Sequence, residues 1–468
     1  MSLTRRQLLG AAAAGGLATV GIYELVDRFT QTPARPPAGA AFAEQHLLDS
    51  VRVVVDNDVE VLVPPLHHEV VTARLGIAPS RRDLVDARAT LEQVLARVES
   101  EYPTTPAGLG MTLGWGLPYF ERHVPAAAGR HLPIDVRASS TRGRRVLALE
   151  NAIRFPSDPA STLLEDNDLA LLLRSDSLAH IAAARKAVFQ DLGLFDITSV
   201  RRGFAGGGFE GEQSLPKQMA MAAGVAGAEL IPDTAELFLG FTSTQRQGLG
   251  PTKIANLETL GYADLRESGY FAHGTHMHLS HMFEDLASWY QTFDHQARVD
   301  TTFRPGLEVP QTVQTVPQGP DDTQTAAEVE RDYAEHRRIG HSGSIQPASR
   351  LLTDVVGSDG TRYPKGTAVP QRADFNTLDN PFAWSADPAR DGFVEGPAAG
   401  LHFVVFTPTS DDFRRVRLSM DGVLPNGTKL AFEEGTLGRG FNQVLKTTHR
   451  QNFLVPPRKA RSFPLAEL

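Results

Sequence analysis

Apolar and polar residues alternate along much of the chain with two different periods, which predict helices and strands in turn. Residues 81–100 and 178–191 show the helical period, and residues 59–63, 111–115 and 169–173 are short apolar runs typical of strands. Because strands and helices follow one another over this length, we expect an α+β fold with helices packed on a sheet. The clearest helix is residues 81–100, whose apolar positions are Leu84, Ala87, Leu91, Val94, Leu95 and Val98.

The second half of the chain repeats this mixture. Residues 236–241 predict a strand that runs into a Ser/Thr/Gln turn, and residues 270–290 predict a strand that turns into a helix. Residues 399–406 predict a strongly apolar strand. Residues 411–420 predict a helix whose inward-facing side chains are Phe413, Val416 and Leu418.

A glycine-rich segment, residues 203–216, separates the two halves. It lacks the Lys-Ser/Thr ending of a phosphate-binding loop, so we interpret it as a domain linker or as a loop over a pocket. At 468 residues the chain is long enough for two domains of ordinary size. We therefore expect a leader at residues 1–43, an N-terminal domain at residues 44–224 and a C-terminal domain at residues 225–468.

Composition narrows the chemistry that the chain can carry. The net charge of −9 leaves no basic surplus for binding phosphates, so nucleic acid is not an expected partner. The chain has no cysteine, which excludes disulfides, thiolate metal sites and cysteine nucleophiles. With 15 histidines in the chain, imidazole is the expected ligand for any metal or haem.

The first residues have the pattern of an export signal. Thr4-Arg5-Arg6-Gln7-Leu8-Leu9 is a twin-arginine motif, and an apolar run rich in Ala and Gly follows as far as Tyr23. This run is too short for a comfortable membrane span. We expect export by the twin-arginine machinery to a periplasmic, extracellular or membrane-tethered location, with either cleavage after Ala40 or Ala43 or retention of the segment as a tether.

The candidate chemistry lies in the segment from His336 to Phe375. A neutral imidazole, from His341 or His336, can ligate a haem iron. The guanidinium of Arg372 stays charged at any working pH and can stabilise negative charge on a bound peroxide. Asp374 follows two residues later. These residue types together are what a haem peroxidase needs.

A second group of histidines offers a rival interpretation. His273, His276, His278 and His281 lie within nine residues of one another. On a strand, His276 and His278 project from one face, and two imidazoles there can bind copper or zinc. On this interpretation the chain is a non-haem metal protein.

The order of these motifs resembles the dye-decolourising peroxidase family from about Leu62 to Gly422. In the first half, MTLGWGLPYFERHV and DLALLLRSDSLAHIAAARKAV resemble the strand, turn and helix segments of that family. In the second half, FLGFTST stands where the family has its Phe-Gly-Phe-x-Asp-Gly loop, and HGTHMHLSHMFEDLASWY resembles its Gly-Gly-Thr/Ser strand and the helix after it. HSGSIQP is placed like the haem-ligand motif, VPQRADFN like the segment that carries the distal arginine, and AAGLHFVVFTPTSDDFRRVRLSM like the final strand and helix.

The resemblance implies two ferredoxin-like α+β sandwich domains, arranged like a dimeric α+β barrel, with antiparallel sheets and helices packed on them. It implies haem b in the C-terminal domain, with His341 as the iron ligand and His336 as the alternative. Gln346-Pro347 stands at the spacing of the family's Asn-Pro and favours His341. Arg372 would be the distal arginine, and Phe241 would lie in the loop beside the haem. The implied reaction reduces hydrogen peroxide while a small organic reductant is oxidised, and the resemblance also allows a homo-oligomer.

The chain departs from the family at the distal carboxylate. Ser243 stands where the family has its catalytic Asp, and a serine hydroxyl cannot act as a base near neutrality. Asp374 or Glu210 would then have to move the proton. Without such a replacement we expect weakened peroxidase activity, or an exported haem- or metal-binding protein without turnover.

Three aromatic residues are candidates for carrying electrons between the haem and the surface: Trp289, Trp384 and Tyr290. For each of them, packing in the core is the simpler role.

Overall fold

The fold is known from a computed structural model. It describes residues 22–29, 42–56, 59–77, 80–209, 212–241, 253–254, 269–308, 324–356, 362–363, 365–433 and 437–468. Ser243, Glu210 and most of the predicted leader lie outside the described residues. Among the described helices, none combines the length and the apolar character needed to cross a membrane.

The first half of the chain forms an antiparallel sheet with two helices packed on it. The strands pair in the order β7-β3-β6-β4, so that the fourth strand lies beside the first and the third beside the second. This is the pairing of a ferredoxin-like βαββαβ unit. The unit consists of β3 (His67–Leu75), α4 (Arg81–Glu101), β4 (Gly110–Gly116), β6 (Leu169–Ser175), α8 (Leu178–Arg185) and β7 (Phe195–Phe204).

The second half repeats the same pairing with a longer first connection. Its strands are ordered β15-β9-β14-β13, and all of these pairs are antiparallel. The strands and the closing helix are β9 (Thr275–Glu284), β12 (Gln371–Arg372), β13 (Phe375–Thr377), β14 (Gly400–Thr407), α15 (Ser410–Met420) and β15 (Leu445–Val455). The helices between β9 and β12 are α10 (Leu286–Thr292), α11 (His295–Thr302), α12 (Ala326–His336) and α13 (His341–Ser349).

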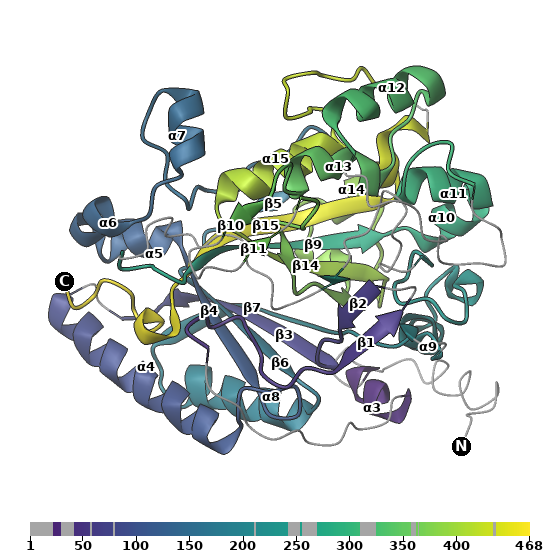
Figure 1. The fold of residues 1–468 in the computed structure, drawn as a ribbon. Coiled ribbons are helices and arrows are strands. Elements are labelled where there is room, and N and C mark those ends of the chain that lie inside the picture. Colours follow the sequence, from purple (N-terminus) through teal and green to yellow (C-terminus); the bar gives the residue numbers. More distant parts are fainter. Residues whose placement is uncertain are drawn as a thin grey trace.

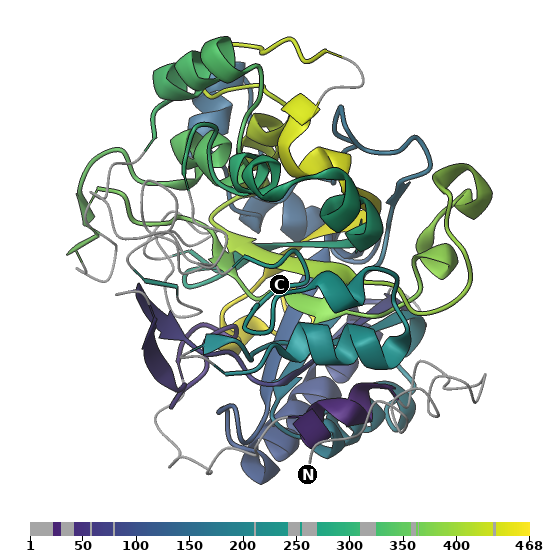
Figure 2. The same ribbon diagram turned by 90° about the vertical axis from the view of Figure 1, so that its right-hand side faces the viewer.

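The two sheets join at both edges and close into a ring of eight strands. Leu454 of β15 pairs with Trp115 of β4, and Asn376 of β13 pairs with Phe204 of β7. Helices α4 and α8 lie on one side of the ring, and α12, α13 and α15 lie on the opposite side (Figures 1 and 2). This confirms the predicted α+β class with antiparallel sheets and packed helices. Apolar side chains that fill part of the ring include Val70, Leu172, Met277, Leu279, Phe375, Val404, Phe406 and Phe453.

Shorter elements surround the ring. A small separate sheet has the order β1-β2-β8, and β5 adds to β15 in parallel. The remaining strands are β1 (Val53–Asp56), β2 (Val59–Leu62), β5 (Leu163–Leu164), β8 (Lys253–Ile254), β10 (Val355–Val356) and β11 (Arg362–Tyr363). The remaining helices are η1 (Tyr23–Leu25), α3 (Val26–Phe29), α5 (Leu117–Arg122), α6 (Pro125–His131), α7 (Val136–Arg142), η2 (Lys186–Gln190), α9 (Leu215–Ala223), η4 (Ala228–Leu230), η5 (Pro381–Trp384), α14 (Pro388–Asp391), η6 (Leu437–Gln443) and η7 (Arg458–Ala460).

Helix α4 forms where the apolar period predicts it. Ser80 caps its N-terminus, because the side chain of Ser80 accepts a hydrogen bond from the backbone N–H of Asp83. The apolar stripe faces the N-terminal sheet, and every one of the six predicted positions is buried, from Leu84 to Val98. The structure also has the predicted elements at residues 111–115, 169–173, 178–191, 270–290, 399–406 and 411–420. In the last of these, Phe413 is buried, whereas Val416 and Leu418 are only partly buried.

The strand predicted for residues 236–241 is wrong. These residues form turns, and Gly240 adopts a left-handed φ of 88°. The indole N–H of Trp289 donates to the carbonyl of Leu239 at 2.9 Å, and the hydroxyl of Tyr290 donates to the carbonyl of Phe238 at 2.8 Å. Side chains of α10 therefore donate hydrogen bonds to backbone carbonyls that, in a sheet, would accept them from a neighbouring strand. The apolar run is buried by this turn rather than by a sheet.

A short segment near the N-terminus is built into the core. Ile22, Tyr23 and Val26 are at most 2% exposed and pack in a cluster with α9 and α10. The hydroxyl of Tyr23 donates to Asp379 at 3.0 Å and accepts from the backbone N–H of Leu378 at 2.9 Å. Residues 22–29 precede both predicted cleavage positions, Ala40 and Ala43. Cleavage at either position would therefore remove a segment that packs in the core.

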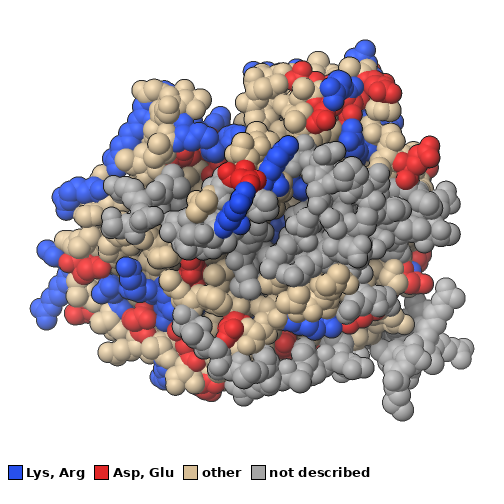
Figure 3. All heavy atoms as spheres, in the orientation of Figure 1, with Lys and Arg blue, Asp and Glu red and all other residues tan. Residues whose placement is uncertain are grey.

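Charge is distributed in both signs over the surface. On the face shown in Figure 3, basic and acidic side chains occur side by side across the part of the chain that is described. Helix α15 shows the same mixture in detail, because Arg414 and Arg415 lie within ion-pair distance of Asp411 and Asp412.

Candidate functional site

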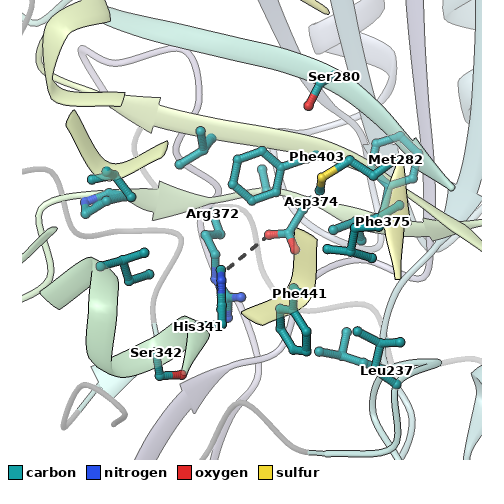
Figure 4. A pocket seen from close by; sticks show the side chains of 18 of the residues that line it. Leu237, Ser280, Met282, His341, Ser342, Arg372, Asp374, Phe375, Phe403 and Phe441 are labelled. Atoms are coloured by element: carbon teal, nitrogen blue, oxygen red, sulfur yellow. Dashed lines mark ion pairs between the residues drawn. The ribbon is translucent and has the colours of Figure 1, made fainter. Parts of the chain in front are cut away.

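A cavity of about 400 Å³ lies against the outer face of the C-terminal sheet, between that sheet and helices α13 and α15 (Figure 4). Alternate residues of each strand face it, since neighbouring side chains of a strand point to opposite faces. Met282 of β9 and Phe403 of β14 form part of the wall, and Phe441 of η6 closes it. The wall is mostly apolar, with a few charged side chains that come from separate elements.

His341 reaches this cavity from the first turn of α13. The helix starts at Gly340, whose backbone lies so close to Phe303 that a Cβ there would be 2.2 Å from the carbonyl oxygen of Phe303. The backbone N–H of Gly343 donates to the same carbonyl at 2.9 Å. Gln346 accepts a hydrogen bond from the backbone N–H of Gln324 at 2.7 Å. These contacts fix the start of α13 and with it the position of the imidazole.

The imidazole of His341 is neutral at physiological pH. Burial, together with the positive charges of Arg372 and Arg417, lowers its pKa to about 4. Its Nδ1 atom is buried and has no hydrogen-bond partner among the described residues. Its ring lies 4.7 Å from that of Phe441, centroid to centroid. A neutral imidazole on the wall of an apolar cavity has the protonation state that a metal ligand requires.

Arg372 and Asp374 line the same cavity as His341. Arg372 belongs to β12, a short strand at the edge of the sheet, and Asp374 follows before β13 begins. The Nε atom of Arg372 lies 3.9 Å from Oδ1 of Asp374. A dashed line marks this ion pair in Figure 4. The Arg372 side chain is 43% exposed and that of Asp374 is 12% exposed. The sequence-predicted pair thus places one cation and one carboxylate at the cavity beside His341.

The other residues predicted for the site have different positions in the structure. Phe241 lines the cavity and packs edge-to-face on Phe303 with centroids 5.0 Å apart. His336 ends α12, pairs with Glu335 at 3.8 Å and does not line the cavity. Ser243 lies outside the described residues. Of the two histidines considered as ligands, only His341 therefore reaches the cavity.

The glycine-rich segment borders the same space. Gly206 and Gly207, which have φ angles of 90° and 78°, line the cavity together with Phe209. A Cβ on Gly207 would lie 2.8 Å from the Cβ of Leu215, so both the backbone conformation and the contact require glycine there. This agrees with the interpretation of the segment as a loop over a pocket.

Glu284 is a cavity residue that the sequence reasoning missed. It ends β9, lines the cavity and is 7% exposed. Burial raises its pKa to about 8, and the negative charge of Asp374 contributes to the rise. The strand alternation that puts His276 and His278 on one face also puts Glu284 on that face. Extending that pattern to the end of the strand would have found it.

A second charged group lies at the α15 side of the cavity. The carboxylate of Asp158 is fully buried, and it accepts a hydrogen bond from Arg450 at 2.5 Å and one from Arg417 at 3.4 Å. Burial lowers the pKa of Arg450 to about 10, and the charge of Asp158 opposes that effect. Arg417 also donates to Asp421 at 2.8 Å. Arg417 of α15 and Arg450 of β15 thus share the carboxylate of Asp158, which links α15 to β15.

The histidine cluster of the rival interpretation is divided between two faces of β9. Nδ1 of His276 is 2.8 Å from the hydroxyl of Thr407, and Nδ1 of His278 is 2.7 Å from the Oδ1 atom of Asn452. His281 faces the other way, with its ring centroid 5.0 Å from that of His402. Within the described residues, no group of three or more histidine or carboxylate side chains has an arrangement that could hold a metal ion. The non-haem metal interpretation is therefore not supported.

The aromatic residues considered as electron routes have packing roles. Trp289 and Tyr290 hold the 238–239 turn through the hydrogen bonds given above. Trp384 packs on His449 with ring centroids 4.9 Å apart, and the guanidinium of Arg201 lies 5.5 Å from the centre of the Trp384 ring. None of the three lines the cavity.

Comparison with known proteins gives one family. Residues 65–457 match the family described as "Family of unknown function (DUF7405)". The chain belongs to this family. No curated protein matches the chain significantly.

Solved structures similar to this DUF7405 protein include peroxidases of the DyP type. DyPB from Rhodococcus jostii RHA1 is 12% identical, with 85% of this chain and 95% of that chain covered and a TM-score of 0.49. A DyP-type peroxidase from Cellulomonas bogoriensis is 19% identical, with 89% and 96% covered and a TM-score of 0.49. An encapsulated DyP-type peroxidase from Mycobacterium smegmatis is 12% identical, with 85% and 95% covered and a TM-score of 0.46. At these values the similarity by itself assigns neither an activity nor a ligand to this chain.

Proposed function

We propose that this DUF7405 protein is a haem-dependent peroxidase that reduces hydrogen peroxide while it oxidises a small organic reductant. The observation that carries the proposal is His341: a neutral imidazole, with Nδ1 unpartnered among the described residues, on the wall of a mostly apolar cavity that also holds Arg372. The order of the sequence motifs supports the same assignment.

The residues of the cavity fit haem b. His341 would supply the nitrogen ligand to the iron, and the apolar wall, with Met282, Phe403 and Phe441, would cover the macrocycle. When bound, haem supplies the electrons that cleave the oxygen–oxygen bond of peroxide. Arg372 would stabilise the negative charge that develops on the peroxide oxygens. Asp374, 3.9 Å from Arg372, would orient the guanidinium or exchange a proton with the substrate.

An absorption spectrum tests the proposal directly. We expect the full-length protein, purified from a haem-replete host, to show a Soret band. His341→Ala should lose that band, because the cavity then lacks its imidazole ligand. His336→Ala is the matched control and should keep it, since His336 lies outside the cavity. A wild-type protein without a Soret band, or a band that survives in His341→Ala, would contradict the assignment.

The missing family carboxylate has a test of its own. Ser243→Asp restores the family's residue type at that position. If the lack of this acid limits proton transfer, peroxide turnover should rise, because general acid–base help is worth about 10²–10⁴-fold. The measurement is the rate of peroxide consumption at matched haem content. Unchanged turnover would mean that another group already moves the proton.

We propose that the protein is exported by the twin-arginine machinery. The motif at residues 4–9 supports this, and the route suits a protein that receives its cofactor before export. Replacing Arg5 and Arg6 together by Lys should leave the protein in the cytoplasm of a host with this machinery. Fractionation followed by immunoblotting measures the distribution, and export of the variant at the wild-type level would rule the route out.

A further inference from the structure

One buried arginine differs from the others in having no carboxylate beside it. Among the described residues, four arginines are at most 2% exposed, and three of them form ion pairs. The paired side chains are Arg201 with Glu165, Arg450 with Asp158, and Arg461 with Glu92 and Glu99. The fourth, Arg174, has no ion pair within the described part of the chain, and no carboxylate contributes to its pKa. Because a buried cation without a counter-charge is costly, this position calls for a partner that the described chain does not supply.

The guanidinium of Arg174 also leaves most of its hydrogen-bond donors unused. Its Nη2 atom donates to the carbonyl oxygen of His46, which is its one hydrogen bond to the described residues. Its Nε atom is buried and has no partner there, although a guanidinium carries several N–H donors. Burial lowers the pKa of Arg174 only to about 10, so the side chain is a cation at neutral pH.

The imidazoles beside Arg174 add no negative charge. Burial, together with the charge of Arg174, lowers the pKa of both His46 and His68 to about 3, so both rings are neutral. The Nε2 atom of His68 lies 2.9 Å from the carbonyl oxygen of Pro65, which fixes that ring. The guanidinium therefore lies between neutral groups and keeps its full charge.

The side chain of Arg174 points into the ring of strands. Ala170 and Leu172 of β6 belong to the apolar cluster inside the ring, and Arg174 follows on the same face of the strand. Its backbone is paired on both sides, with His68 of β3 and Gly110 of β4. Arg174 nevertheless lines the cavity that holds His341. Because strands cover its backbone on both sides, it is the side chain that reaches this cavity.

The cavity reaches Arg174 past one seam of the ring. At this seam β13 pairs with β7 through a single pair of residues, Asn376 and Phe204. Strand β12 pairs with β14 and does not continue the pairing with β7 in the described structure. Arg372 of β12 and Gly206, which follows β7, both line the cavity. The space therefore extends from the outer face of the C-terminal sheet to the end of the ring where Arg174 lies.

We propose that Arg174 binds the carboxylate of an organic ligand whose apolar part lies in this cavity. A planar guanidinium donates parallel hydrogen bonds to both oxygens of a carboxylate, and the pair is strongest where water is excluded. The cavity wall also includes Leu62, Ala205 and Ala373, which suit a hydrocarbon or aromatic body. Arg174 is thus assigned as a binding residue, separate from the cation at Arg372.

A carboxylate can reach Arg174 from two kinds of ligand. Haem carries propionate groups at one edge of the macrocycle, and a haem ligated by His341 would share the cavity with Arg174. A free small organic acid carries the same group, and it is then a candidate for the organic reductant. The shared chemistry is recognition of a carboxylate, so the inference holds whether or not the peroxidase proposal is correct.

The stability of the ligand-free protein gives the first test. In full-length protein from a haem-limited host, Arg174→Met should keep or raise the melting temperature, because an unpaired buried charge is replaced by an apolar side chain of similar length. Arg461→Met is the matched control and should lower the melting temperature, because Glu92 and Glu99 lose their cation. A fall in Arg174→Met as large as that in Arg461→Met would overturn the inference, since the guanidinium would then serve the fold.

Binding of a small acid gives the second test. Benzoate is the probe, and benzamide is its neutral counterpart of nearly the same shape. Titration calorimetry on the ligand-free full-length protein should show benzoate binding about 10- to 100-fold more tightly than benzamide, which is the range for hydrogen bonds to a charged group. Arg174→Met should remove this preference, and Arg174→Lys should keep part of it. Arg122→Gln removes an exposed cation outside the cavity and should leave the preference unchanged.

Titration with haem and with haem dimethyl ester separates the two sources of the carboxylate. The ester has the same macrocycle but no charged propionate. If a propionate lies on Arg174, the wild type should bind haem more tightly than the ester, Arg174→Met should bind both alike, and haem should displace benzoate. If the ligand is a free acid, the wild type should bind haem and its ester alike, and the haem-loaded protein should still bind benzoate.

The outcomes keep this inference apart from the proposed function. Equal binding of benzoate and benzamide together with equal binding of haem and its ester would overturn the inference, even in a protein with a Soret band. A preference for benzoate in a protein that shows no Soret band would remove the peroxidase assignment and keep the carboxylate site. A preference that survives in Arg174→Met would place the site on another cation.

Discussion

Glu284 holds a proton in the folded protein that the unfolded chain releases. Its pKa rises from an ordinary value of 4.5 to about 8, so between these pH values the folded state binds more protons than the unfolded state. The free energy of unfolding must then fall as the pH rises through this window. Glu284→Gln removes the titrating group, and its melting temperature should fall less than that of wild type between pH 5 and about 8. Parallel melting curves at all pH values would contradict this.

Residue-scale features were partly accessible from the sequence. His341 and Arg372 were found because their residue types and order carry chemistry, and the structure brings both to one cavity. Glu284 was missed because its significance is burial without a partner, which depends on β14, β13 and the helices packed above them. His336 and His341 look equivalent in the sequence. Only the structure distinguishes them: His341 lies in the first turn of α13, which faces the sheet, whereas His336 is the last residue of α12.

At the scale of elements, local pattern predicted amphipathic structure well and buried irregular structure poorly. Residues 81–100 are helical because their apolar period and cap are both local. The run at 236–241 has the composition of a strand, but side chains from α10 donate hydrogen bonds to its backbone carbonyls. The local sequence pattern does not predict these hydrogen bonds. Strand β7 was not predicted. Its sequence lacks the usual alternation of apolar and polar residues, because two side chains that point into the ring, Ser199 and Arg201, are polar and buried.

The segment at residues 22–29 leads to a prediction about processing. Removing residues 1–41 should cost on the order of 3–5 kcal/mol more than removing residues 1–21, because Ile22, Tyr23 and Val26 leave the core only in the shorter protein. Guanidinium unfolding of both truncated proteins measures the difference. Val26→Asp in the longer protein should reproduce most of the loss. Equal midpoints for the two truncations would show that the segment does not contribute to the fold.

Arg461 ties the C-terminal segment to helix α4. It is 2% exposed and donates to both carboxylate oxygens of Glu92 and of Glu99. Arg461→Ala should lower the free energy of unfolding by about 3 kcal/mol, because two carboxylates lose their shared cation. Arg461→Lys keeps the charge but not the planar fork, so it should recover only part of the loss. Chemical denaturation of the three proteins measures this, and a loss in Arg461→Ala below about 1 kcal/mol would contradict it.

At the scale of the whole molecule, the closed ring joins the two ferredoxin-like units. Strand β15 pairs with β9 of its own unit and with β4 of the other, and β13 meets β7 at the opposite seam. Neither sheet can open without losing pairs in both units. We therefore expect one cooperative transition by calorimetry at neutral pH, with equal calorimetric and van't Hoff enthalpies. Two resolved transitions would show that the units unfold separately.

The order in which the ring closes also bears on synthesis. Leu454, Phe463 and Leu465 belong to the same apolar cluster as Leu84 of α4 and Trp115 of β4. The N-terminal unit therefore cannot complete its core until residues 454–465 have left the ribosome, although domains made first usually fold first. Until then, its partly formed core remains open to chaperones. Completion of the first half's core thus has to wait for a segment that is synthesised long after helix α4, against which it packs.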